Sequence, residues 1–265
     1  MARMTLAGAL RSESVRLRRS PLIALHVALA LAVGVAAGLY FATTPWDSKL
    51  AFDAFVQLLG AGAPLLVGLA CGLSADAERA AGDYANMFGM PSRRIALAAK
   101  VISLLGLGVC AAALAVGSFA AVMTVFSRPL PVWWAAVDAV LGIGAGSAAC
   151  YVLGLFCALK WGRNITIGVG AAGLVVALMS VGGLANGLVT ATLSGAMSGG
   201  PVAWLFLVWP LRLASLIVEL AIAPGAALSR SLGETLFACI AVTAVVVILA
   251  GVLIDRFEDA KHTAE

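Results

Sequence analysis

The chain has 265 residues, of which 62% are hydrophobic and only 11% charged, and its mean hydropathy is +1.05. Soluble domains average about 45–50% apolar and about 25% charged residues, and one core of this length would leave much of that apolar surface in water. A soluble enzyme, a disordered protein and a nucleic-acid-binding protein are therefore excluded. The net charge of +4 is less informative than the positions of the charges.

Residues 1–20 predict a cytoplasmic amphipathic helix that lies on the inner leaflet. Leucines recur at helical spacing and arginines occupy the other faces: Leu6, Leu10 and Leu17, with Arg11, Arg18 and Arg19. Glu13 precedes Arg16 by three residues and can pair with it on a helix. The arginines would face anionic lipid, whereas a plain basic anchor without further role is the simpler alternative.

Six apolar runs predict an all-α membrane domain over residues 21–254, followed by a cytoplasmic tail, 255–265. A bilayer core of about 30 Å needs about 20 apolar residues in a helix, and continuous apolar runs favour helices over barrel strands. The third run is long enough to require tilt or an extension into the headgroups. The expected spans are residues 22–41, 51–73, 96–126, 134–159, 165–190 and 235–254.

The basic residues predict the orientation of these spans. With the N-terminus inside, thirteen of the 17 lysines and arginines lie in cytoplasmic segments. Cytoplasmic loops of membrane proteins carry an excess of lysine and arginine, which is known as the positive-inside rule. We therefore expect both termini in the cytoplasm of a multi-pass protein.

The inner loop at residues 74–94, between the second and third spans, predicts a short cytoplasmic helix that docks on a partner. Apolar side chains at a loop position favour a docking element. The alternative is that they fold back onto the membrane interface. The candidate residues combine acidic groups with apolar and amide side chains: Asp76, Glu78, Asp83, Tyr84, Asn86, Met87 and Phe88.

Residues 191–233 precede the last span and predict an outer, re-entrant element. The stretch 201–224 is apolar, but a seventh span would move the C-terminal basic residues outside and would place charges in lipid. A pair of short helices broken by Pro210 fits better, with the tryptophans at the interface. The residues of interest are Trp204, Trp209, Pro210, Arg212 and Glu219.

Small residues recur as G-x-x-x-G, a spacing that lets membrane helices approach closely. We expect the first and fifth spans to form a dimer surface, with Gly34, Gly38, Gly183 and Gly187 as candidates. The five cysteines contain no C-x-x-C pair and are interpreted as small buried hydrophobes.

Sequence motifs for chemistry are missing. The chain has no P-loop motif, no H-E-x-x-H and no histidine near its serine-rich patches, so neither an enzyme nor a metal site is expected. Asp53 and Asp138 lie close to the outer ends of their spans, where we expect them to reach water. With few buried ionisable groups for a proton or ion path, the energy source is expected on another subunit.

Four segments together resemble the membrane subunits of type-2 ABC exporters, and among them the permeases of bacterial lantibiotic-immunity transporters. They are residues 11–21, 63–73, 81–100 and 204–210. The resemblance implies six spans, an interfacial elbow helix at Glu13, Arg16, Arg18 and Arg19, a cytoplasmic coupling helix and re-entrant outer helices before the sixth span. It also implies a second permease, identical or a sister subunit, and two copies of an ABC ATPase that binds ATP and Mg.

The sequence is thus interpreted as the permease subunit of an ATP-driven exporter in the bacterial cell membrane, without a cofactor of its own. The expected substrate is an amphipathic peptide such as a lantibiotic, taken from the membrane lipid. The alternatives are a permease for a drug or lipid-like molecule, and a stand-alone secondary carrier or structural membrane subunit.

Overall fold

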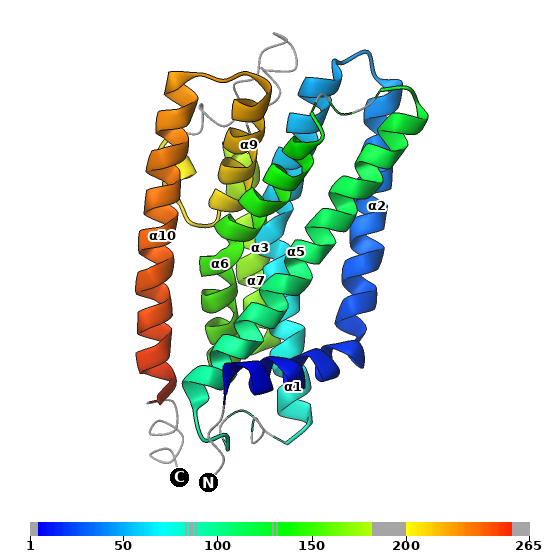
Figure 1. Cartoon of the computed structure of the whole chain (residues 1–265). Coiled ribbons are helices and arrows are strands. Elements are labelled where there is room, and N and C mark those ends of the chain that lie inside the picture. The colour runs from blue at the N-terminus through cyan, green and yellow to red at the C-terminus, as the bar shows by residue number, and fades with distance from the viewer. Residues whose placement is uncertain are drawn as a thin grey trace.

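The computed structural model describes residues 5–82, 84, 87, 89–128, 130, 132–181 and 200–255. These residues form eight α-helices and one short 3₁₀ helix, with no strand among them, so the predicted all-α class is confirmed. Figure 1 shows a bundle of long helices, with α1 (Leu6–Arg18) lying across the end where α10 finishes.

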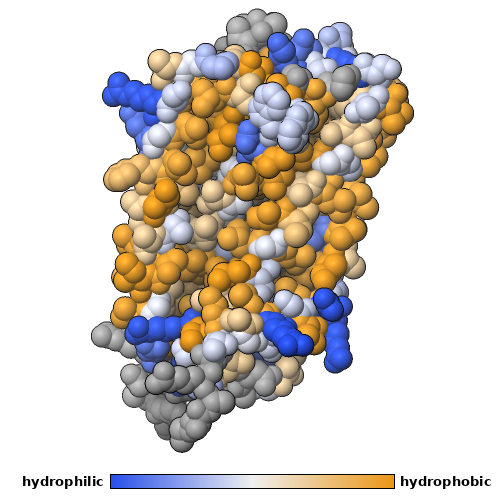
Figure 2. All heavy atoms as spheres, in the orientation of Figure 1, coloured by the Kyte–Doolittle hydropathy of each residue, from blue (hydrophilic) through white to orange (hydrophobic). Residues whose placement is uncertain are grey.

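Six of the described helices are long and apolar enough to cross a membrane, as the sequence predicts: α2 (Pro21–Thr43), α3 (Ser48–Ala80), α5 (Arg93–Val125), α6 (Trp134–Trp161), α7 (Arg163–Ser180) and α10 (Ala226–Asp255). Figure 2 shows apolar side chains over the middle of one face and hydrophilic ones gathered toward both ends. A multi-pass membrane protein follows from this distribution.

The observed helices differ in length from the predicted spans. α3 continues through the first charged residues of the inner loop, and α10 begins nine residues before the predicted span, at Ala226. The end of the predicted fifth span lies outside the described residues. α5 runs obliquely across the bundle, in agreement with the tilt expected of a 33-residue helix (Figure 1).

Local sequence signals place the helix ends. The side-chain oxygens of Thr5, Ser20, Asp47 and Ser92 accept hydrogen bonds from backbone N–H groups in the first turns of α1, α2, α3 and α5. Such caps satisfy amides that have no partner within the helix. α6 and α7 are separated only by Gly162, whose φ of 87° favours glycine.

The glycine pairs lie where two helices of the same chain approach each other closely. Gly34 and Gly38 face α5, Gly68 and Gly72 face α7, and Gly142 and Gly146 face α9 (Trp209–Ile222). A Cβ atom at Gly38 would lie 2.8 Å from that of Val122, too close for a side chain. The small size of Gly34 and Gly38 is therefore explained without a second copy, and their dimer role stays a prediction; Gly183 and Gly187 lie outside the described residues.

The cysteines occupy mainly interior positions. Cys71, Cys150, Cys157 and Cys239 are buried, whereas Cys110 is exposed on α5, and all five are free thiols. The buried four agree with their interpretation as small hydrophobes.

Candidate functional site

A buried ion pair joins α3 to α5 at the end of the bundle where α1 lies. The Nζ atom of Lys100 lies 2.5 Å from Oε1 of Glu78, and the two side chains are only 2% and 1% exposed. Lys100 also donates to the hydroxyl of Ser74 at 3.3 Å.

Two residues of α1 complete this charge network. Arg16 forms ion pairs with Glu13 at 2.8 Å and with Glu78, and Glu13 lies 3.5 Å from Lys100. Burial lowers the pKa of Arg16, but the hydrogen bonds that its guanidinium donates to Glu13 and Glu78, together with the Coulomb attraction of these carboxylates, outweigh burial and raise the pKa. The guanidinium stays charged, and α1 is thereby fastened to α3 and α5.

The two other arginines predicted for the elbow helix point elsewhere. Arg18 and Arg19 are exposed, whereas Glu13 and Arg16 are turned toward the bundle. α1 therefore presents a basic surface on one side and an ion-pairing face on the other. Its interaction with lipid remains a prediction.

Two apolar side chains of the loop between α3 and α5, those of Tyr84 and Met87, are not exposed as expected. Tyr84 and Met87 are only 5% and 3% exposed, and they belong to a core cluster with Leu22, Leu97 and Ile254. The expectation that the side chains of Tyr84 and Met87 are exposed is therefore wrong, and the docking role of the loop stays a prediction. Burying a large apolar side chain is worth about 1.5–3 kcal/mol, which explains why they fold inward.

Other predicted coupling residues occupy different positions. Asp76 pairs with Arg163 at 2.8 Å, and this partly exposed contact joins α3 to the start of α7. Glu78 belongs to the buried network. Asp83, Asn86 and Phe88 lie outside the described residues.

At the opposite end, the segment 200–222 packs into the bundle. The 3₁₀ helix Gly200–Trp204 leads to α9, and Pro210 lies at the start of α9, consistent with the predicted break. Arg212 donates to Thr235 at 3.0 Å and to Ser231 at 3.1 Å, both on α10. Its guanidinium also lies 5.3 Å from the ring centroid of Trp204.

The two tryptophans differ in position. Trp204 is 45% exposed, as expected of an interfacial residue, but Trp209 is buried at 2% and does not lie at an interface. Trp209 instead packs with Leu213 and Cys239, between α9 and α10.

Two buried acidic groups, Asp53 on α3 and Glu219 on α9, share a contact with Ser215, and the sequence analysis does not predict this cluster. Asp53 is 4% exposed and Glu219 is fully buried, so the expectation that Asp53 reaches water is wrong. Ser215 donates to Oδ1 of Asp53 at 2.7 Å and lies 3.4 Å from Oε1 of Glu219. Gln57 donates to the other oxygen of Asp53 at 2.8 Å. This polar cluster joins α3 to α9.

Sequence reasoning missed Lys100, Ser215 and Gln57 as members of these clusters. One signal was present: Lys100 lies inside an apolar run, and a charge there needs a partner. No local signal connects Ser215 with Asp53, because they are 162 residues apart.

Among the residues that the structure describes, no group of three or more histidines, cysteines and acidic residues is placed to hold a metal ion. Comparisons with family models, with curated proteins and with solved structures give no match.

Proposed function

We propose that the chain is the membrane subunit of an ATP-driven exporter of the ABC type, which works with two copies of a separate ATPase and with a second permease. The support comes from the resemblance of four segments and from one structural observation. That observation is the buried ion pair between Glu78 and Lys100, which joins the helices on the two sides of the inner loop.

The ion pair offers a route for coupling. Residues 81–92 connect the end of α3 to the start of α5, so a partner that displaces this loop acts on both helices together. Arg16 extends the connection to α1. Because breaking a buried ion pair is costly, the three helices should move as a unit rather than separately.

The docking surface differs from the one the sequence predicts. With Tyr84 and Met87 buried, the exposed described positions at this end include Arg79 and the partly exposed Asp76. We assign the ATPase contact to these charges together with the intervening loop. The substrate is proposed to be an amphipathic peptide, expelled from the membrane, and both termini are placed in the cytoplasm.

The test is co-purification of the solubilised chain with its partners, followed by mass identification and measurement of transport-stimulated ATP hydrolysis. Arg79→Glu and Phe88→Asp are expected to weaken binding of the ATPase. Ser48→Asp is the matched control for Phe88→Asp, because it adds the same charge in the first turn of α3 at the opposite end, where an acidic residue is tolerated. Recovery of the chain without any P-loop ATPase would contradict the proposal.

A stand-alone secondary carrier is the second candidate, and the buried cluster of Asp53 and Glu219 favours it. Ionisable residues at membrane depth often mark ion or proton paths. A carrier would transport under an ion gradient without ATP, and Asp53→Asn would abolish that transport. An exporter would need ATP in the same vesicles whether or not an ion gradient is present.

A further inference from the structure

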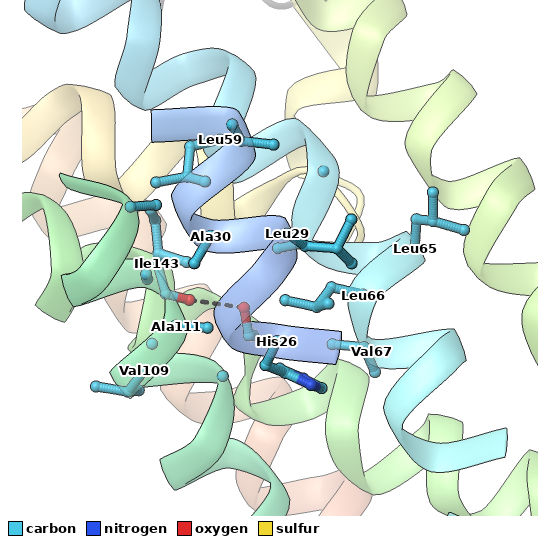
Figure 3. Close-up of a pocket in the computed structure, with 18 of the residues that line it drawn as sticks. His26, Leu29, Ala30, Leu59, Leu65, Leu66, Val67, Val109, Ala111 and Ile143 are labelled. Carbon is cyan, nitrogen blue, oxygen red and sulfur yellow. Dashed lines mark hydrogen bonds between the residues drawn. The ribbon is translucent and has the colours of Figure 1, made fainter. Parts of the chain in front are cut away.

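A pocket of about 240 Å³ lies at membrane depth within this chain, between α2, α3, α5 and α6. Its walls are formed mainly by leucine, alanine and valine side chains and by glycine residues. The lining residues with polar side chains are His26, Ser147 and Tyr151. Figure 3 shows leucines of α3 on one side and residues of α5 and α6 on the other. The hydroxyl of Ser147 already donates within α6, to the carbonyl oxygen of Ile143 at 2.7 Å.

The pocket opens sideways toward lipid. Leu29, Val33 and Leu58 are among its lining residues, and they are 39%, 44% and 44% exposed. All three belong to membrane-spanning helices, so the molecules that reach the opening are those of the bilayer. An apolar pocket of this kind does not favour water as an occupant.

His26 presents a hydrogen-bond acceptor that has no donor among the described residues. The side chain is 1% exposed, and its Nδ1 atom lies 2.8 Å from the carbonyl oxygen of Leu22. A carbonyl oxygen only accepts, so Nδ1 carries the proton and Nε2 of the neutral ring is an acceptor. No described residue donates to Nε2, which is buried. Figure 3 shows the ring beside Val67 at one end of the pocket.

We propose that this pocket binds one lipid of the surrounding bilayer, with its hydrocarbon part between the helices. Its hydrogen-bond donor, a hydroxyl or an amide N–H, binds Nε2 of His26 after a small movement of the side chains that cover this atom. A buried acceptor left without a donor is unfavourable, and a donor group on the occupant supplies the missing bond. The volume of the pocket is below the range of about 300–1,000 Å³ that is typical of sites for drug-sized ligands. The pocket therefore suits a single hydrocarbon chain rather than a peptide. The site is separate from the peptide export proposed above and needs no ATPase.

The test uses photoactivatable hexadecanol bearing a diazirine, and its methyl ether, which lacks the donor. The full chain in lipid nanodiscs is labelled and the modified peptides are mapped by mass spectrometry. We expect the alcohol to label pocket-lining peptides of α2, α3 and α5. His26→Phe, which keeps a ring but removes the acceptor, should lower labelling by the alcohol roughly two- to tenfold and leave labelling by the ether unchanged.

Gly62→Leu tests the pocket independently of the histidine. Gly62 lines the pocket and a Cβ there meets open space, so leucine should fill the cavity without a clash and reduce labelling by both probes. Gly106→Leu is the control, because Gly106 on α5 is exposed, also has open space around it and does not line the pocket. Each variant is compared after its thermal unfolding has been shown to match the parent's.

Three results would overturn the proposal. Absence of probe at these helices would mean that the opening is closed, for instance by a second copy. Equal labelling of the parent and Gly62→Leu would place the probe elsewhere. Unchanged labelling by the alcohol in His26→Phe would show that the occupant does not donate a hydrogen bond to Nε2.

Discussion

Lys100 and Glu78 form an ion pair of 2.5 Å in a part of the chain where both side chains are almost fully buried. Glu78 lies near the end of α3 and Lys100 near the start of α5, and the loop between them turns back into the core through Tyr84 and Met87. The end of the bundle at which α1 lies is therefore held by charge and by apolar packing at the same place.

Removing one partner of this pair should destabilise the protein strongly. We expect Glu78→Gln to lower the free energy of unfolding by about 3–5 kcal/mol, because Lys100 would keep only Ser74 and the more distant Glu13. The double variant Glu78→Leu/Lys100→Met should lose less than the sum of the single variants, because no unpaired charge remains between them. Thermal or denaturant unfolding in detergent measures both effects.

The exposed pair of Arg230 and Glu234 on α10 is the control for that series. Arg230→Ala should change stability little, because solvent screens an exposed pair. A loss for Glu78→Gln no larger than that for Arg230→Ala would contradict a structural role of the buried pair.

Gly38→Leu distinguishes packing within the chain from packing between chains. The new side chain would meet Val122 and the carbonyl oxygen of Phe119, so we expect a loss of about 1–3 kcal/mol in the stability of the monomer. Thermal unfolding at several protein concentrations and crosslinking of the dimer are measured together. A lower dimer fraction at unchanged monomer stability would favour the dimer surface instead.

The positions of the basic residues predict the topology. In a variant without native cysteines, Ser229→Cys should react with a membrane-impermeant maleimide in intact cells, and Ser12→Cys only after permeabilisation. Both positions are exposed, Ser12 on α1 and Ser229 near the start of α10. Labelling of Ser12→Cys from outside intact cells would reverse the proposed orientation.

Arg212 is expected to hold α9 against α10. Arg212→Met keeps much of the apolar stem but removes the donors to Thr235 and Ser231, and hydrogen bonds from a charged group contribute about 1.5–3 kcal/mol. We expect hydrogen exchange in α9 to become faster while exchange in α2 stays unchanged. Equal protection of α9 in the variant and the parent would show that apolar packing alone holds this helix.

The sequence by itself determined the number of long apolar helices, the helix before the first span and the break at Pro210. Each depends on properties of a short stretch: the length of an apolar run, the spacing of leucines and arginines, or the missing N–H of a proline. These signals act within one helix, so they can be read before the helices are placed together. The exact ends of α3 and α10 were less well predicted, because helices continue past the apolar part where packing supports them.

Only the tertiary structure decided which polar groups meet and which apolar residues are buried. Asp53 contacts Ser215 across 162 residues, and Glu78 contacts Lys100 because α3 and α5 pack at one end of the bundle. Tyr84 and Met87 have a loop's place in the sequence but a core position in space, in one apolar cluster with residues of α2, α3, α5, α6 and α10. Such contacts depend on the relative placement of separate helices, which no local pattern of residues specifies.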